Sequence, residues 1–268
     1  MTMATSGPSS CDESFTEIFV ESSLDGSREP GLLWMPSEGT AEALVVGLHT
    51  WSADRLTSQA GFLPFCRERN WALLLPEFRG PNLVTSSRAM EAGGSPLARR
   101  DIVDATRDVL ARHFAKETPP VFLHGGSGGG HMGLLTAARE DFPWTAVSSW
   151  CPITDLVAWH EENSDYRPHV AAVCGGPPGP QTADEYWQRS PLHFAKALSR
   201  HRLLLAHGRE DRAVSFHHSW NLAQRIEAEN PEEFYFHIFD GGHEIHHEAA
   251  FAFFDRTLQA AKTTELTG

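Results

Sequence analysis

Two short stretches of the 268-residue sequence carry side chains whose types and spacing could do chemistry. Residues 125–129 read GGSGG and match G-x-S-x-G, the pattern of a sharp turn that exposes a serine hydroxyl as a nucleophile. Residues 243–247 read HEIHH and match H-E-x-x-H, which on a helix binds zinc through two imidazoles. The two patterns imply different hydrolytic mechanisms, and the elements around them decide which one is favoured.

The surroundings of Ser127 favour a nucleophile. The apolar run at 121–125 predicts a buried strand and residues 129–140 predict a helix, so Ser127 falls in the turn between them. The alternative is a glycine-rich loop that holds a phosphate at the helix N-terminus. The Lys-Ser/Thr ending of such a loop is missing, and no G-x-G-x-x-G follows the first buried strand.

A nucleophilic serine needs a base and an orienting acid, which follow it in the order Ser, Asp, His when the turn has this form. Asp211 follows a predicted strand at 202–208, and Glu210 beside it is an alternative acid. His243 follows a predicted strand at 233–239 and two glycines that predict a tight loop. The sequence therefore predicts that Ser127, Asp211 and His243 form a catalytic triad.

The zinc interpretation is less favoured, because H-E-x-x-H needs helical turns on both sides of the motif. Here the two glycines at 241–242 separate His243 from the preceding strand, and no third ligand is identifiable. We expect His243 to lie in a loop, and His246 and His247 to be exposed residues at the start of the last helix. No metal and no cofactor are predicted.

The rest of the sequence predicts the fold that must hold these loops. Two short strands come first, and six apolar runs typical of strands buried on one or both faces follow them, at 43–49, 71–78, 121–125, 144–152, 202–208 and 233–239. Helical segments, such as an amphipathic one at 96–114, alternate with these runs. This order predicts an α/β fold with a doubly wound, mostly parallel, eight-stranded sheet that has helices on both faces.

The domain organisation is simple in this interpretation. We predict a flexible leader at residues 1–13 and a single domain at residues 14–268, which is large enough to bury a full core. Residues 153–192, after the sixth strand, are rich in aromatic residues, Pro and Gly, and predict an irregular, cap-like insertion.

These motifs together resemble those of one known family. The segments GGSGGG, HGREDRAV and GGHEI resemble the nucleophile, acid and histidine motifs of the prolyl oligopeptidase catalytic domain, and YWQRSP at 186–191 resembles its Y-x-x-R-S-P segment. The resemblance spans roughly residues 43–260 and implies the α/β-hydrolase fold and a serine peptidase or esterase activity. The family's N-terminal propeller has no counterpart in the sequence, which implies that its size filter for substrates is absent.

An oxyanion hole needs two backbone N–H groups aimed at the developing negative charge. Gly128, directly after the nucleophile, is expected to supply one of them. By analogy with the H-G-x loop of related hydrolases, the residue expected to supply the other is Trp51, although Thr50 stands where glycine is usual.

Four aromatic residues of the insertion are candidates for a substrate pocket, namely Trp159, Tyr166, Tyr186 and Trp187. Packing within the insertion would explain the same residues. The neighbouring His131, in the first turn after Ser127, is expected to pack or to bond locally.

Composition limits the partners. The net charge of −13 disfavours a nucleic acid and, more weakly, an anionic membrane surface. No apolar run approaches the 18 or so residues of a spanning helix, and no signal peptide is evident. The four cysteines show no paired spacing and are expected to be reduced, which favours a cytoplasmic location.

The sequence therefore predicts a serine hydrolase that cleaves an ester or amide bond of a small molecule or short peptide through an acyl-enzyme. Peptidase and carboxylesterase activities both fit these residues. An acyltransferase or cyclising enzyme with the same triad, and a non-catalytic binding protein with this fold, are the alternatives. The oligomeric state does not follow from the sequence.

Overall fold

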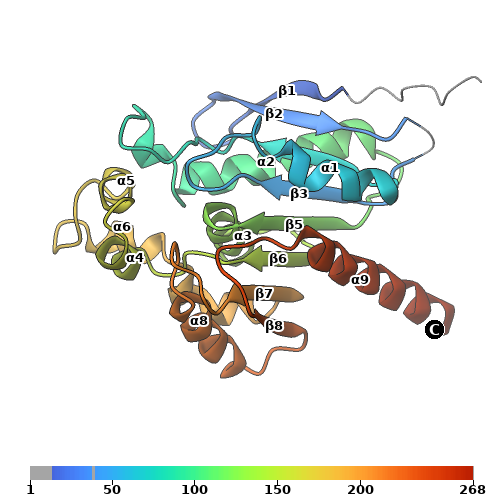
Figure 1. Ribbon diagram of the computed structural model, residues 1–268. Helices are drawn as coiled ribbons and strands as arrows, with labels where there is room; N and C mark the ends of the chain where they lie inside the picture. The colour runs from blue at the N-terminus through green and yellow to red at the C-terminus, as the bar shows by residue number, and fades with distance from the viewer. Residues whose placement is uncertain (1–13, 38–39, 268) are drawn as a thin grey trace, which may run out of the picture.

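A computed structural model of the protein describes residues 14–37 and 40–267 (Figure 1). The predicted leader at 1–13 lies outside the described residues. No helix in the described ranges is both long enough and apolar enough to cross a membrane.

The centre of the structure is one eight-stranded sheet with the strand order β1-β2-β4-β3-β5-β6-β7-β8. Only the pairs β1–β2 and β2–β4 are antiparallel, so the prediction of a mostly parallel sheet is confirmed. The strands are β1 (Thr16–Glu21), β2 (Arg28–Trp34), β3 (Leu44–Leu48), β4 (Ala72–Pro76), β5 (Val121–Gly126), β6 (Ala146–Trp150), β7 (Leu203–Gly208) and β8 (Phe234–Phe239).

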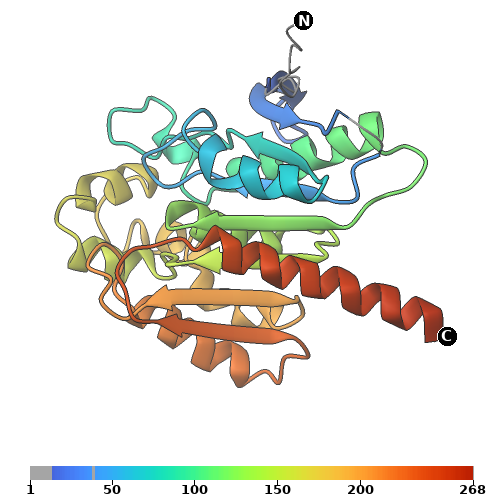
Figure 2. The same ribbon diagram turned by 45° about the vertical axis from the view of Figure 1, so that its right-hand side comes forward.

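Helices cover both faces of the sheet, as the alternation of strands and helices predicts (Figures 1 and 2). Along β3, Leu44 and Val46 join one buried cluster and Val45 joins the other, because neighbouring side chains of a strand point to opposite faces. The first cluster contains residues of α2 (Pro96–His113), α3 (Gly128–Arg139), α7 (Ala195–Leu198) and α8 (His217–Glu227). The second contains residues of α1 (Gln59–Glu68) and α9 (His247–Thr267).

The insertion at 153–192 is ordered into short helices, so the prediction of an irregular segment is wrong. It contains α4 (Leu156–Glu162), α5 (Arg167–Val173) and α6 (Ala183–Gln188). The described residues also include two 3-10 turns, η1 (Ala89–Glu91) and η2 (Pro191–Phe194). Helices of six or seven residues are too short to show a clear period in the sequence. At α4 a local signal marks the start, because the Asp155 side chain accepts hydrogen bonds from two N–H groups there.

The insertion lies at the carboxyl ends of the parallel strands (Figures 1 and 2). Two of its aromatic residues, Trp159 and Tyr186, belong to a third buried cluster with Trp51, which follows β3, and Val214, which follows β7. The loops after β3, β5, β7 and β8 therefore meet beneath it, at the edge where α/β sheets hold their ligands.

Candidate active site

Ser127 lies on the predicted sharp turn between β5 and α3. Its backbone has φ of +54°, which is strained for a residue with a side chain, and its N–H donates to Trp150 O at 2.8 Å. The flanking glycines have a steric reason. A Cβ on Gly125 would lie 2.5 Å from the Gly129 carbonyl carbon, and a Cβ on Gly129 would lie 2.3 Å from Leu48 O. The turn leaves the Ser127 side chain at the carboxyl edge of the sheet, half-buried.

Asp211 and His243 meet from two neighbouring loops. His243 Nδ1 donates to Asp211 Oδ2 at 2.7 Å, and the other carboxylate oxygen accepts the N–H groups of Ala213 and Val214 at 2.9 and 3.0 Å. Glu210, the alternative acid, is exposed. The tautomer that this bond selects leaves His243 Nε2 free to accept a proton.

The charge state of Asp211 follows from its partners. Burial alone would raise the pKa of this carboxyl group, but hydrogen bonds from His207 and His243 outweigh burial and hold the pKa well below its usual range. Asp211 is therefore ionised at neutral pH, which suits a group that orients and stabilises an imidazolium.

The loop that carries His243 packs directly on the turn that carries Ser127. Ile245 fills the space above Gly126, where a Cβ would lie 2.2 Å from the Ile245 Cδ1 atom. The Ser127 hydroxyl and His243 Nε2 are not hydrogen-bonded to each other in the described residues, although proton transfer needs them about 2.6–3.2 Å apart. The structure thus forms the predicted bond between Asp211 and His243 and packs the His243 loop on the turn that carries Ser127.

The two predicted oxyanion donors converge. The point where a Cβ of Gly128 would lie is 2.3 Å from Trp51 N, so the backbones of the two residues touch. Gly128 is the first residue of α3, where an N–H has no partner within the helix and the helix dipole is positive. A backbone hydrogen bond holds the loop at Trp51, because Trp51 O accepts the N–H of Asn82 at 2.9 Å.

The H-E-x-x-H residues do not share a helix. His243 and Glu244 precede α9, which begins at His247. The prediction that His247 is exposed is wrong: its ring packs 5.0 Å from the ring of Phe62, and its Nδ1 is 3.1 Å from His124 Nε2. Burial lowers the pKa of His247 to about 4. The sequence could not show this inward direction, because it depends on how α9 packs against α1.

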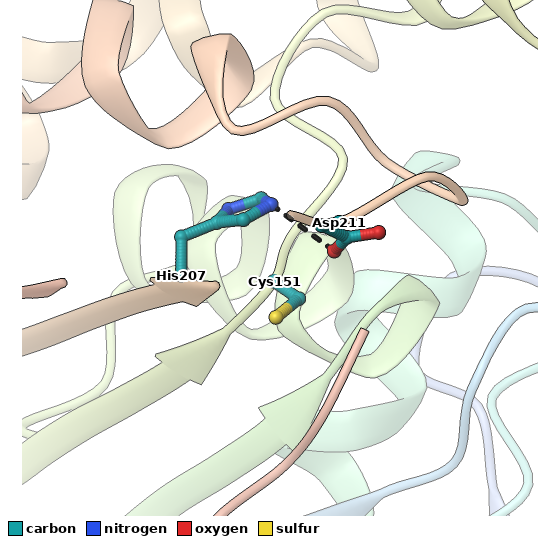
Figure 3. Close-up of side chains that lie close together, drawn as sticks. All are labelled: Cys151, His207 and Asp211. Atoms are coloured by element: carbon teal, nitrogen blue, oxygen red, sulfur yellow. Dashed lines mark ion pairs between the residues drawn. The ribbon is translucent and has the colours of Figure 1, made fainter. Parts of the chain in front are cut away.

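Sequence reasoning missed the role of His207, the residue at the end of β7. Its Nε2 lies 3.2 Å from Asp211 Oδ2, and Figure 3 shows its ring nitrogen facing that carboxylate. Cys151 lies close by and donates its thiol to Glu244 O at 3.3 Å. Burial raises the pKa of Cys151 to about 12, so the thiol is protonated and is a poor nucleophile.

The ligand atoms of Cys151, His207 and Asp211 lie within 4.8 Å of one another, and in the described ranges these are the residues that could hold a metal ion. All three already have protein partners. A metal on Asp211 Oδ2 would also compete with His243, so this cluster suits the support of a triad better than a resident metal.

The four aromatic candidates of the insertion differ in how far they are buried. Trp159 is buried with its ring 4.9 Å from both Trp51 and Tyr166, and its Nε1 donates to Ala213 O, next to the Asp211 loop. Tyr186 is also buried and donates its hydroxyl to Gly176 O. Trp187 is half-exposed. Through Trp159 the insertion thus contacts the loop that carries Trp51 and the loop that carries Asp211.

Trp187 and Tyr186 border an apolar hollow of about 350 Å³ on the insertion, with Val157, Pro178, Gly179, Ala183 and His193. Trp187 stacks on His193 with ring centroids 5.4 Å apart. His131 is completely buried, which confirms the prediction that it packs, and its Nε2 donates at 2.7 Å to Arg189 O, 58 positions along the chain.

Comparison with known proteins identifies a related peptidase. The chain is 31% identical over 128 residues to an uncharacterized peptidase, YtmA, of Bacillus subtilis (strain 168); the match covers 48% of this chain and 49% of that protein. The chain thus spans about half the length of this curated relative.

Solved structures share the fold. A puromycin-hydrolyzing peptidase of Mycobacterium tuberculosis matches 91% of this chain and 39% of its own with a TM-score of 0.72 and 20% identity. The acylaminoacyl peptidase of Pyrococcus horikoshii matches 86% of this chain and 38% of its own with a TM-score of 0.66 and 17% identity. The sequence profile of the prolyl oligopeptidase family matches residues 98–260, and the chain belongs to this family.

Proposed function

We propose that this protein is a serine hydrolase that cleaves an amide or ester bond of short peptides or small molecules, with Ser127 as nucleophile. The observation that carries the proposal is the hydrogen bond of 2.7 Å between His243 and Asp211, on a loop that packs against the strained turn at Ser127 through Ile245. Membership of a peptidase family supports hydrolysis of peptide bonds in particular.

The first half of the reaction forms an acyl-enzyme. His243 Nε2 takes the proton of the Ser127 hydroxyl while Oγ attacks the substrate carbonyl. The N–H groups of Gly128 and Trp51 stabilise the oxyanion that forms. The protonated His243 then gives its proton to the departing amine or alcohol, and the bond to the leaving group breaks.

The second half returns the free enzyme. Water attacks the acyl-enzyme as His243 Nε2 accepts its proton, and the tetrahedral intermediate releases a carboxylic acid as Ser127 regains its proton. Asp211 holds the imidazole tautomer in both halves and stays ionised. His243 therefore acts in turn as base and acid, and the reaction needs no redox or cofactor step.

Turnover of paired chromogenic substrates tests the proposal. Aminoacyl and acyl-dipeptidyl p-nitroanilides measure amide cleavage, and p-nitrophenyl butyrate measures ester cleavage, with folded Ser127→Ala protein as the control. We expect wild-type turnover that Ser127→Ala abolishes. Higher kcat/KM for the anilides would support a peptidase, and preference for the ester a carboxylesterase. Acylated product formed with added hydroxylamine or amine in place of free acid would indicate acyl transfer. Turnover that survives in Ser127→Ala would refute the proposal.

A further inference from the structure

His207 contacts the same carboxylate oxygen that His243 uses. We propose that His207 is a positioning residue for the reaction, which holds Asp211 in the orientation that His243 needs. This inference rests on the proposed function. It assigns a role to a buried imidazole that the triad mechanism does not include.

Four donors surround the carboxylate of Asp211, whose side chain is fully buried. Oδ2 faces His243 Nδ1 at 2.7 Å and His207 Nε2 at 3.2 Å. Oδ1 accepts the N–H groups of Ala213 and Val214. Both oxygens are therefore fixed, and rotation of the carboxylate would break bonds on each side.

The surroundings of His207 fix the proton on Nε2. Nε2 lies 3.0 Å from Val214 O, an acceptor, so this nitrogen must carry a hydrogen. Nδ1 lies 2.6 Å from Ser219 Oγ on α8, which can donate to it. His207 thus donates from Nε2 and is held at both nitrogens, and its side chain is completely buried.

Val214 closes the arrangement. Its N–H donates to Asp211 Oδ1, and its carbonyl accepts from His207 Nε2. The imidazole, the carboxylate and one peptide unit therefore brace one another. In contrast, the His243 side chain is 29% exposed and comes from a glycine-containing loop. Of the two imidazoles on Asp211, His207 is therefore the one that is buried and bonded at both nitrogens, whereas His243 is partly exposed.

This difference has a consequence for catalysis. Without His207, the bond from the partly exposed His243 would be the side-chain bond left to align Oδ2 of Asp211, while Ala213 and Val214 hold only Oδ1. Because His207 is anchored on β7 and through Ser219 on α8, Asp211 stays in place when His243 moves during proton transfer. A displacement of about 1 Å in a catalytic group can cost about 100-fold in rate.

The experiment compares His207→Leu, His207→Gln and Ser219→Ala with the wild type. The measurement is the second-order rate constant of labelling by a fluorophosphonate across pH, which reports the reactivity of Ser127 without knowledge of the natural substrate. We expect labelling to fall about 100-fold in His207→Leu and about 10-fold in Ser219→Ala. His207→Gln keeps an N–H donor and should recover at least 10-fold of the loss.

The pH profile separates positioning from a general loss of structure. When Asp211 is misplaced, the imidazolium of His243 loses its stabilising carboxylate, so the acid limb of the profile should move to lower pH in His207→Leu. For p-nitrophenyl butyrate, kcat should fall while KM stays within about twofold, because the effect is confined to the transition state. His201→Leu is the matched control, since this partly buried histidine lies just before β7 and bonds to the backbone of Ala137 on α3.

A double-mutant cycle completes the test. In an Asp211→Asn background, His207→Leu should cost little more, because His207 acts through Asp211. Three results would overturn the inference. The first is a loss of labelling rate in the double variant that equals the sum of the two single losses in free energy. The others are an acid limb that stays in place or moves to higher pH, and wild-type labelling in both His207→Leu and Ser219→Ala. Absence of labelling in the folded wild-type protein would instead refute the proposed function.

Discussion

The contact between Gly128 and Trp51 gives a prediction whose size follows from the structure. In Gly128→Ala, the new Cβ would lie 2.3 Å from Trp51 N and 2.5 Å from Trp51 Cα, whereas ordinary contacts begin at 3.4 Å. Both neighbours are backbone atoms, so either the backbone at Gly128 or the backbone at Trp51 has to move away by about 1 Å. The movement separates the two N–H groups that are proposed to bind the oxyanion.

Loss of one oxyanion donor costs about 2.7–4 kcal/mol of transition-state stabilisation, or about 100- to 1000-fold in kcat. We expect Gly128→Ala to lower kcat for p-nitrophenyl butyrate and the rate of fluorophosphonate labelling by this factor. The reactive serine, the base and the acid are unchanged, so the loss would come from the oxyanion site alone.

Gly133→Ala is the matched control on the same helix. A Cβ at Gly133 would meet only the Leu48 and Leu123 side chains, at 3.6 Å and beyond, so it fits without movement. This substitution should leave activity unchanged and stabilise α3 by about 0.5–1 kcal/mol, since alanine has the higher helix propensity. Wild-type activity in a folded Gly128→Ala protein would refute the assignment of Trp51 N–H as a donor.

Three further predictions concern the acid, the buried histidines and the ion network. Asp211→Asn should lower kcat by about 10⁴-fold, because the amide favours the wrong tautomer of the base, while the circular dichroism spectrum stays that of the wild type. Burial and then the neighbouring His247 lower the pKa of His124 to about 3, so the unfolded chain binds a proton first as pH falls below 6.5 and stability decreases from there to about pH 3. His124→Phe should make the free energy of unfolding, measured in urea, less dependent on pH by up to about 1.4 kcal/mol per unit in this window; an unchanged slope would contradict the burial of a neutral imidazole. Arg79 is completely buried and pairs with the buried Asp101, so Arg79→Met should destabilise the fold by about 3–5 kcal/mol, and adding Asp101→Leu should recover part of it. A loss below about 1 kcal/mol in the single variant would show that the pair does not contribute as described.

Much of the fold was predictable because burial leaves a direct trace in the sequence. Strands such as β3 and β5 are buried on both faces, so each is a continuous apolar run with sharp ends. The position of Ser127 was predictable for a different reason: only glycines fit around such a turn, and their spacing is visible in the sequence. The loops after β7 and β8 follow from the parallel order of the strands.

The remaining features depend on contacts between distant segments. The helices of the insertion are too short for periodicity to reveal them. His247 points inward because α1 and β5 provide the rings and the imidazole that it meets. His207 stood in the same motif as Asp211, but its role requires Ser219 from the following helix and a carbonyl of the intervening loop.

The central claim is that Ser127 is the activated nucleophile, and mapping a covalent adduct tests it most directly. The folded protein is treated with a fluorophosphonate, digested and analysed by mass spectrometry, beside Ser127→Ala and a sample treated with a chelator. We predict one adduct per chain, located on Ser127, absent from Ser127→Ala and unaffected by the chelator. An adduct on another residue, or no adduct on the folded wild-type chain, would contradict the account.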